Sequence, residues 1–352
     1  MQTIQQYGIM KEVIEVKREH SAPSKVVVGD VVNSLDTYLP GGRRVVIVTD
    51  ANVHRRYKDI INKYDYVLIG MGESIKTLAT VEKIYAEFLN MGIDRSSFVV
   101  GFGGGIVTDI AGYVASTYMR GVEFGFVAST LLAQVDASVG GKNGVNFEGY
   151  KNMIGTFSQP AFVLCDYSLL ATLPEREFRA GLAEIIKAGL IADKGLFELF
   201  EVHTPDEFRN DRALLSEAIA RAIKVKADIV GEDEREAGLR RKLNLGHTFA
   251  HAIEKSTPAF LHGEAVAIGT SMIAQLSADT GLIRQTEADR VKDVFQRMGL
   301  PTESGIDLKK LVKALKSDKK KESATVNFVL MDSIGSCLIR SFSFAEIGGI
   351  KL

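Results

Sequence analysis

The sequence has little net charge, little cysteine and no long apolar run, and each absence excludes a class of protein. Its 43 basic and 44 acidic residues leave a formal net charge of −1, which gives no electrostatic footprint for nucleic acid or for an anionic membrane surface. No stretch reaches the length of a membrane span, and the N-terminal segment lacks the apolar region of a secretory signal. We therefore expect a cytoplasmic protein that binds neither nucleic acid nor membrane, and any anionic ligand must be met locally.

Cysteine is almost absent, and Cys165 and Cys337 lie far apart in the sequence. We interpret them as reduced thiols of a cytosolic protein; a disulfide between them is the less favoured alternative. The 352 residues, 46% hydrophobic and 25% charged, are enough for two domains with cores of their own.

The N-terminal half alternates short β-rich runs with helical stretches. The expected helices are 78–91 and 107–116, and the expected strands are 13–16, 25–28, 44–48, 66–69, 98–100, 122–127 and 161–164. This alternation predicts an α/β domain with a parallel sheet, in which ligands gather at the carboxyl ends of the strands.

The C-terminal half has longer helical patterns, and it ends in an expected hairpin of 325–331 and 336–341. The expected helices are 176–192, 212–232, 241–255, 263–280 and 286–298. The predicted organisation is an α/β domain over residues 1–174 followed by a mostly helical domain over residues 175–352.

A glycine-rich turn, Gly101–Gly105, follows an expected strand and leads into an expected helix. Glycines there let backbone N–H groups approach a phosphate, and the helix N-terminus favours negative charge. The turn favours nucleotide or phosphate binding, although a glycine-rich turn without a ligand is the alternative. Gly72–Lys76 is weaker evidence, since a surface turn explains it as well as a ribose or phosphate clamp does.

Three of the six histidines, His247, His251 and His262, fall in one window together with Glu254 and Glu264. Neutral imidazoles and carboxylates in a partly apolar setting are suited to Zn²⁺ or another divalent metal. Spacing alone selects His247 and His251, four residues apart on one helix face, with His262 or a glutamate as the third ligand. An ordinary pair of helix histidines is the alternative.

The segment 129–152 and the helices after it carry several cations among small residues. Individually these are ordinary surface charges. Together, in a nearly neutral chain, they indicate a pocket for a phosphorylated and carboxylated small molecule. The cations are Lys142, Lys151, Lys187, Lys226, Arg240 and Arg241, with Arg120 just before the segment; Asp136, Asn146 and Asn152 lie among them in the segment.

Five segments together resemble the 3-dehydroquinate synthase family. They are GGGIVTD from Gly103, STLLAQVDASVGGKNGVN with the following KNMIGTF, AEIIK around Glu184, LNLGHTFAHAIE, and HGEAVAIG. The resemblance extends from Asp50 to the segment 318–320 and is far more specific than any single motif. It implies an NAD-binding α/β domain, a largely helical metal-binding domain, an active site between them, and a homodimer.

The resemblance also implies the cofactor residues. The metal, Zn²⁺ or Co²⁺, would be held by Glu184, His247 and His262, whereas His251 would belong to the substrate site. The implied NAD⁺ positions are Asp50, Met71, Gly72, Glu73, Ser74, Ile75, Lys76, Gly104, Gly105, Ile106, Val107, Thr108, Asp109, Ser129, Thr130, Lys142, Lys151, Leu169, Leu170, Ala171 and Thr172.

The implied reaction converts 3-deoxy-D-arabino-heptulosonate 7-phosphate to 3-dehydroquinate and phosphate, the second step of the shikimate pathway. NAD⁺ is regenerated in each turnover, so the net reaction is that of a phosphate-eliminating carbon–oxygen lyase. The implied substrate and catalytic positions are Arg120, Asp136, Lys142, Asn152, Lys187, Lys226, Arg240, Asn244, His251 and a lysine of the pair Lys319 and Lys320.

Charge indicates what these residues would do. Four cations, Lys142, Lys187, Lys226 and Arg240, would hold the phosphate and carboxylate of the substrate, and Arg120 and Asn152 would complete the phosphate site. Asn244 and His251 would position ring hydroxyls or relay protons, and Asp136 would orient a lysine or a hydroxyl.

Three departures from the family pattern remove no reactive group: Ala128-Ser129-Thr130 replaces Pro-Thr-Thr, Ala250 replaces a glycine, and the loop between Glu254 and His262 is shorter than in many relatives. Three alternative functions stay open. Another sugar phosphate cyclase would keep NAD⁺ and metal, a metal-dependent alcohol dehydrogenase would release NADH, and a binding protein would lack activity. The cations of the expected phosphate pocket argue against the second, and the full set of reactive groups argues against the third.

Overall fold

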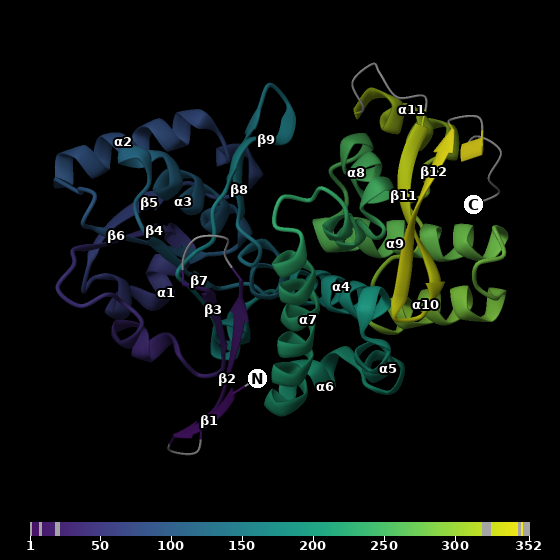
Figure 1. Ribbon diagram of the computed structural model, residues 1–352, viewed down its shortest axis with the longest axis horizontal. Coiled ribbons are helices and arrows are strands. Elements are labelled where there is room, and N and C mark those ends of the chain that lie inside the picture. Colours follow the sequence, from purple (N-terminus) through teal and green to yellow (C-terminus); the bar gives the residue numbers. More distant parts are fainter. Residues whose placement is uncertain (1, 7–8, 18–21, 319–324, 344–345, 348–352) are drawn as a thin grey trace. The chain divides into compact units, whose positions relative to one another are not determined.

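The computed structural model divides the chain into two compact units, Met1–Leu173 and Pro174–Leu352. It describes residues 2–6, 9–17, 22–318, 325–343 and 346–347. Among these residues, no helix is long and apolar enough to span a membrane. The first unit is α/β and the second is mostly helical, which confirms the predicted fold class (Figure 1).

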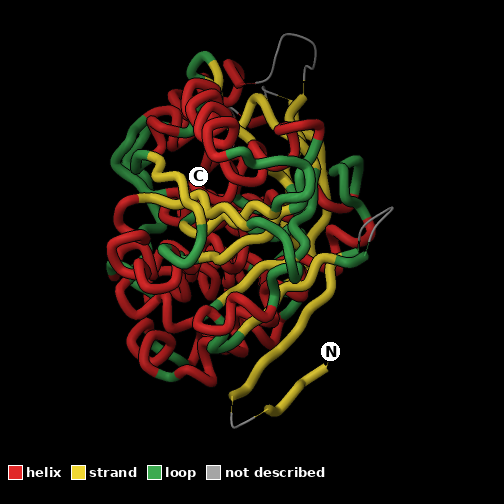
Figure 2. The backbone as a smooth tube through the Cα atoms, turned by 90° about the vertical axis from the view of Figure 1, so that its left-hand side faces the viewer, coloured by secondary structure: helices red, strands yellow, loops and turns green. Residues whose placement is uncertain are grey.

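The first unit is built on a sheet that has eight strands within the described residues, in the order β1-β2-β3-β10-β7-β6-β4-β5. Figure 2 draws the strands in yellow. From β3 onward in this order, neighbouring strands run parallel, whereas β1 and β2 add an antiparallel edge. The strands are β1 (Gln2–Gln6), β2 (Ile9–Val16), β3 (Ser24–Val28), β4 (Val45–Asp50), β5 (Asp65–Ile69), β6 (Phe98–Gly103), β7 (Phe124–Ala128) and β10 (Phe162–Cys165).

Three helices, α1 (Ala51–Ile61), α2 (Leu78–Met91) and α3 (Gly105–Thr117), connect the central strands. Figure 1 shows α2 and α3 on one side of the sheet and α1 on the other. Strand β4 pairs with β5 on one side and β6 on the other, so the winding of the chain reverses between β4 and β6. In doubly wound sheets, ligands bind at such a point, beyond the carboxyl ends of the strands.

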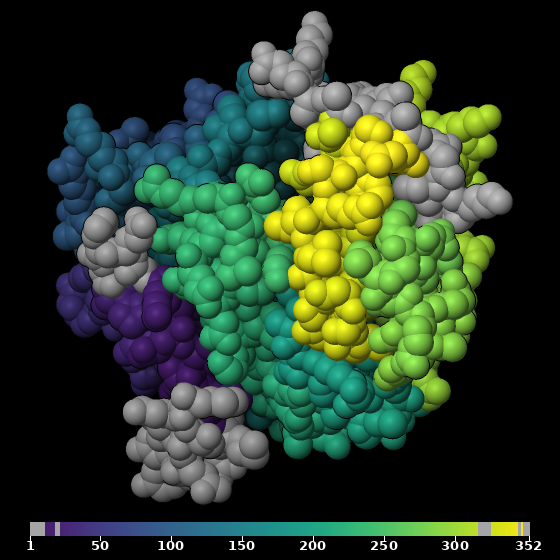
Figure 3. Space-filling view, turned by 45° about the vertical axis from the view of Figure 1, so that its right-hand side comes forward, coloured from purple at the N-terminus to yellow at the C-terminus, as the bar shows by residue number. Residues whose placement is uncertain are grey.

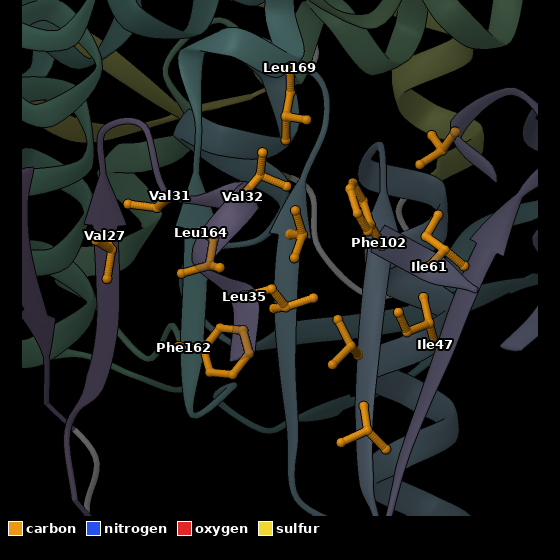
Figure 4. Packing of buried hydrophobic residues seen from close by; sticks show 14 of the residues in the cluster. Val27, Val31, Val32, Leu35, Ile47, Ile61, Phe102, Phe162, Leu164 and Leu169 are labelled. Carbon is orange, nitrogen blue, oxygen red and sulfur yellow. The ribbon is translucent and has the colours of Figure 1, made fainter. Parts of the chain in front are cut away.

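The α1 side of the sheet carries a hydrophobic core formed by alternate strand residues. Phe98, Val100 and Phe102 of β6 face this side, because successive side chains of a strand point to opposite faces. They pack in one cluster with Ile61 of α1 and with Leu35 from the 3-10 turn Val32–Thr37 (Figure 4).

The opposite face of β6 carries glycine so that α3 can lie close to the sheet. A Cβ atom added to Gly103 would lie 2.5 Å from the Val107 side chain, and one added to Gly101 would lie 2.8 Å from the Ala111 Cβ. Two glycines of the Gly101–Gly105 turn therefore serve helix packing. A separate ribbon of β8 (Lys142–Phe147) and β9 (Tyr150–Phe157) also packs on α3.

The second unit is organised around two buried helices, α4 (Glu175–Ala192) and α9 (His262–Asp279). A helix that is buried all round is expected to be apolar all round. Glu184 and Lys187 are charged exceptions in the buried part of α4.

The remaining elements surround these two helices. The hairpin of β11 and β12 presents its outer face at the surface of the unit, where Figure 3 shows it in yellow. The elements are α5 (Lys194–Val202), α6 (Pro205–Asn210), α7 (Arg212–Glu232), α8 (His247–Ser256), α10 (Gln285–Arg297), α11 (Leu308–Asp318), β11 (Thr325–Ser333) and β12 (Ser336–Ser343).

The predicted helix over 241–255 is wrong in its first part. Leu239–Asn244 forms a 3-10 turn, and α8 begins only at His247. Gly246 separates the two with a φ of +76°, a conformation that favours glycine and interrupts a helix.

Several elements were not predicted: α1, α5, α6, α11, β1, β8 and β9. Helix α1 has only Val53 and Ile61 buried, so its apolar periodicity is weak. Strand β9 is exposed or half-buried along its whole length and has no clear apolar alternation.

Candidate metal centre and cofactor site

Glu184 is a carboxylate in the middle of the buried helix α4, with an exposed fraction of 3%. Burying a carboxylate is costly unless a cation compensates it. Lys187 lies three residues further along the same face, and its Nζ is 2.5 Å from Glu184 Oε2. The other carboxylate oxygen, Oε1, faces two imidazoles, with His247 Nε2 at 3.8 Å and His262 Nε2 at 3.6 Å.

Glu184, His247 and His262 each offer one ligand atom, and these atoms all lie within 4.8 Å of one another. In a tetrahedral site with bonds of about 2.1 Å, neighbouring ligand atoms are about 3.4 Å apart. The two nitrogen–oxygen distances of 3.8 and 3.6 Å are within a few tenths of that value. Two imidazole nitrogens and one carboxylate oxygen therefore fit a divalent metal that keeps a coordination position open for substrate.

Both imidazoles turn the same nitrogen toward this centre. His247 Nδ1 is 3.2 Å from the carbonyl oxygen of Leu245, and His262 Nδ1 is 3.3 Å from Glu254 Oε1. An Nδ1–H that donates to such an acceptor leaves the lone pair on Nε2, which is the nitrogen nearer to Glu184.

The surroundings shift the pKa values of the two histidines in opposite directions. Burial and the nearby Lys187 lower the pKa of His247 to about 3, against the opposing effect of Glu184. Burial also acts to lower the pKa of His262, but its hydrogen bonds with Glu184 and Glu254 outweigh burial and raise that pKa to about 10. His247 is therefore already a neutral ligand, whereas His262 must release a proton when a metal binds.

Close contacts between helices at two glycines determine the positions of these ligands. A Cβ atom added to Gly263 would lie 1.9 Å from the carbonyl oxygen of Ala180 in α4, and one added to Gly246 would lie 2.2 Å from Thr270 Oγ1 in α9. Each glycine immediately adjoins a histidine of the centre. The absence of a side chain at these two positions lets α4, α8 and α9 approach closely enough to bring their ligands together.

Arg176 and Glu264 hold the start of α9. The guanidinium donates two hydrogen bonds to the carboxylate, at 2.7 and 2.6 Å, and a third to the carbonyl oxygen of Ala259. The same carboxylate accepts the backbone N–H of Leu261 at 2.8 Å. Glu264, considered at first as a candidate ligand, thus serves to fix the segment that carries His262. Its position three residues after Leu261 is a helix-start signal, but no sequence signal connects it to Arg176.

The predicted substrate residues of the second unit lie near these elements. His251 is exposed one turn after His247, with ring centroids 5.6 Å apart. Arg240 is buried and donates to the carbonyl oxygen of Glu234, and Asn244 Nδ2 donates to Glu236 Oε1 at 2.6 Å. Lys226 lies half-buried on α7. Lys319 and Lys320 lie outside the described residues.

Most of the predicted NAD⁺ positions in the first unit follow the carboxyl ends of parallel strands. Asp50 ends β4, residues 71–76 follow β5, residues 104–109 follow β6, Ser129 and Thr130 follow β7, and residues 169–172 follow β10. Because these strands are parallel neighbours, their carboxyl ends meet at one edge of the sheet. Lys142 and Lys151 lie outside this pattern, on the ribbon β8–β9, and are exposed.

The start of α3 forms a narrow cradle at this edge. A Cβ atom added to Gly104 would lie 3.1 Å from Thr130 Cγ2, and one added to Gly105 would lie 3.0 Å from the Ala137 Cβ. Gly104 is the N-cap residue and supplies no capping side chain. The first backbone N–H groups of α3 are thus suited to an anionic group such as a pyrophosphate.

Lys76 contacts two other predicted site residues, Asp109 and Asn152. Its Nζ forms an ion pair with Asp109 and lies 2.6 Å from Asn152 Oδ1. Burial raises the pKa of Asp109 to about 6, and the cation of Lys76 opposes this rise. Asp136 and Glu73 add to the rise, so their charges also lie near Asp109. Asn152 has a φ of +51°, a conformation uncommon outside glycine that occurs often at functional sites.

Two predicted residues are exposed on turns of the first unit. Arg120, in the turn after α3, has a φ of +69° and follows Met119 with a φ of +49°. Consecutive residues in this conformation carry backbone strain of the kind found at binding sites. Met71 is 55% exposed.

Two family descriptions and several individual proteins match this chain over most of its length. Residues 66–180 match the family described as 3-dehydroquinate synthase N-terminal, and residues 181–321 match 3-dehydroquinate synthase C-terminal. The 3-dehydroquinate synthase of Acidithiobacillus ferrooxidans is 44% identical over 306 residues, 84% of each chain. That of Halorhodospira halophila is 46% identical over 271 residues, 76% of this chain and 77% of the other.

The chain belongs to the 3-dehydroquinate synthase family. The predicted family and the predicted class of enzyme, a phosphate-eliminating lyase, are thereby confirmed. A solved structure with the same fold is 2-epi-5-epi-valiolone synthase from Streptomyces hygroscopicus subsp. jinggangensis 5008, with NAD⁺ and Zn²⁺ bound. It has a TM-score of 0.85 and 30% sequence identity, and the match covers 95% of this chain and 97% of that one.

Proposed function

We propose that this member of the 3-dehydroquinate synthase family converts 3-deoxy-D-arabino-heptulosonate 7-phosphate to 3-dehydroquinate and phosphate, with NAD⁺ and Zn²⁺ or Co²⁺ as cofactors. The observation that carries the proposal is the group of Glu184, His247 and His262 on three helices that glycine contacts hold together. The test is phosphate release from the heptulosonate phosphate with less NAD⁺ than substrate.

Glu184 Oε1 and the Nε2 atoms of His247 and His262 would hold the metal. When bound, a divalent ion lowers the pKa of a substrate hydroxyl and polarises a carbonyl oxygen. Lys187 forms an ion pair with Glu184 and adds a cation beside it. The predicted cations Lys142, Lys226 and Arg240, together with Lys187, bind the phosphate and carboxylate of the substrate, and Arg120 and Asn152 complete the phosphate site.

NAD⁺ is bound by the first unit, residues 1–174 in the predicted division, and the metal by residues 175–352. NAD⁺ bound there would supply reversible hydride transfer from and back to a substrate alcohol. Gly104 and Gly105 bind its pyrophosphate at the N-terminus of α3, and Lys76 orients Asn152 and Asp109 nearby. Calorimetric titration tests the assignment; undiminished NAD⁺ affinity in a Gly104→Val, Lys76→Ala double variant would contradict it.

His251 belongs to the substrate site and is not a metal ligand. His251→Ala is expected to lower kcat by roughly 10²- to 10⁴-fold, the range for loss of a proton-transfer group, while one metal ion per chain stays bound. Because His251 is exposed, its replacement is expected to leave folding unchanged, and a thermal melt checks this. Loss of the metal in this variant would restore the pair chosen by spacing, His247 and His251.

We further propose that the enzyme is a cytoplasmic homodimer whose partner molecule is the small sugar phosphate and neither nucleic acid nor membrane. The family resemblance and the near-zero net charge support this. Sedimentation equilibrium tests the dimer, for which a single monomeric species at micromolar concentration would be contrary evidence. Cell fractionation tests the location.

A further inference from the structure

Glu254 is a carboxylate beside the metal centre but outside the group of three ligands. It lies in the last turn of α8, and its Oε1 is 3.3 Å from Nδ1 of His262, the first residue of α9. Its side chain is only 10% exposed. Electrostatic interactions are stronger in such a shielded position than in water.

The two nitrogens of His262 face different carboxylates. Nε2 lies 3.6 Å from Glu184 Oε1, whereas Nδ1 lies 3.3 Å from Glu254 Oε1. If Nδ1–H donates to Glu254, the lone pair remains on Nε2, where a metal would bind. Metal-binding histidines commonly have such an acceptor behind them, and it fixes both the tautomer and the orientation of the ring.

A hydrogen-bond acceptor that fixes the orientation of the ring matters most at His262. Among the three ligands its side chain is the most exposed, at 30%, compared with 11% for His247 and 2% for Glu184. At His247 the corresponding acceptor is a neutral backbone carbonyl, that of Leu245. A carboxylate at His262 supplies the same hydrogen bond and adds a negative charge next to the ion.

Helix formation does not explain a glutamate at this position. Negative charge near the C-terminal end of a helix is unfavourable, because the backbone carbonyls already place partial negative charge there. Glu254 is two residues from Ser256, the last residue of α8. Its charge is therefore better explained by what it contacts than by the helix that carries it.

We propose that Glu254 is a positioning residue of the metal site: its carboxylate holds the His262 ring with Nε2 directed to the metal, and its charge strengthens metal binding. The inference rests on the metal site of the proposed function. It assigns Glu254 no contact with the substrate.

The test compares metal binding by Glu254→Ala, Glu254→Gln and the unaltered chain. Zn²⁺ affinity is measured by competition with a chromophoric chelator, and the Co²⁺ form by its visible absorption. Glu254→Ala is expected to weaken Zn²⁺ binding roughly 10- to 100-fold and to change the Co²⁺ spectrum. Glu254→Gln is expected to fall between the two, since its amide oxygen still accepts from Nδ1 but carries no charge.

Glu201→Gln is the matched control. It removes the charge of a partly buried glutamate in the same unit, one that is paired with Arg290. The control is expected to lower stability without changing metal affinity, whereas the Glu254 variants are expected to lose metal affinity beyond any change in the stability of the metal-free chain.

Each outcome is decisive. Equal Zn²⁺ affinity and an unchanged Co²⁺ spectrum in Glu254→Ala would overturn the inference while leaving the proposed function intact, and so would a loss no larger than that of Glu201→Gln. Failure of the unaltered chain to bind either metal would overturn both.

Discussion

Replacement of Glu184 by glutamine is expected to reduce kcat/KM on the order of 10³-fold. The substitution keeps the size of the side chain and one carbonyl oxygen but removes the negative charge that faces His247 and His262. Polarisation by a metal supplies several kcal/mol to a transition state, and each 1.4 kcal/mol corresponds to a factor of ten in rate. The loss of this ligand should therefore remove most of the catalysis. Steady-state assays with excess Zn²⁺ measure the effect, together with the metal content of the purified variant.

The substitution also deprives Lys187 of its buried partner, so stability must be followed in parallel. Removing one member of a buried ion pair commonly costs about 3–5 kcal/mol, although relaxation of the lysine toward solvent reduces that cost. Circular dichroism establishes whether the variant is folded, and Glu201→Gln again serves as the ion-pair control. A folded, metal-free Glu184→Gln enzyme with activity within tenfold of the original would show that the metal assignment is wrong.

A single methyl group at Gly263 is expected to destabilise the second unit by about 3 kcal/mol, because overpacking a tight contact costs about 1–3 kcal/mol and occasionally more. The Cβ atom of Gly263→Ala would lie 1.9 Å from a backbone oxygen of α4, which cannot move aside as a side chain could. Relief of this overlap requires α9 to shift away from α4. The shift would displace His262, the adjacent residue, so metal affinity should fall together with stability.

Chemical denaturation and Zn²⁺ titration measure these two effects. Gly41→Ala is the matched control, because nothing lies within 4 Å of a Cβ atom added there. It is expected to leave both quantities unchanged. Stability and metal affinity of Gly263→Ala equal to those of Gly41→Ala would contradict the view that close contact of α4 with α9 assembles the centre.

Local sequence signals predicted some elements completely. Helix α2 extends over the predicted residues 78–91, since Thr77 caps its start and Gly92, with a φ of +68°, ends it. Helix α7 likewise spans the predicted 212–232, after the capping side chain of Asp211. In both helices the apolar pattern agrees with the capping residue at the start, so neighbouring elements do not change where the helix begins.

The spacing of residues along the sequence was not enough to identify the three candidate metal ligands. A spacing of four residues can only report neighbours on one helix, and it therefore paired His251 with His247 and left His262 or a glutamate as the third ligand. Glu184, His247 and His262 come from three different helices, and the contacts that join them depend on glycines at the crossings. The resemblance supplied this set as an expectation, because a family motif reflects the three-dimensional contact. The bond from Arg176 to Glu264, 88 residues apart, has no sequence signal at all.

The most direct test of the account is one assay of the purified enzyme with the heptulosonate phosphate, Zn²⁺ and NAD⁺ far below the substrate concentration. Phosphate and NADH absorbance are followed together. Phosphate release is expected to exceed greatly the NAD⁺ supplied, with no lasting NADH, because the cofactor is regenerated in each turnover. NADH that accumulates without phosphate release, or phosphate release only from another sugar phosphate, would contradict it.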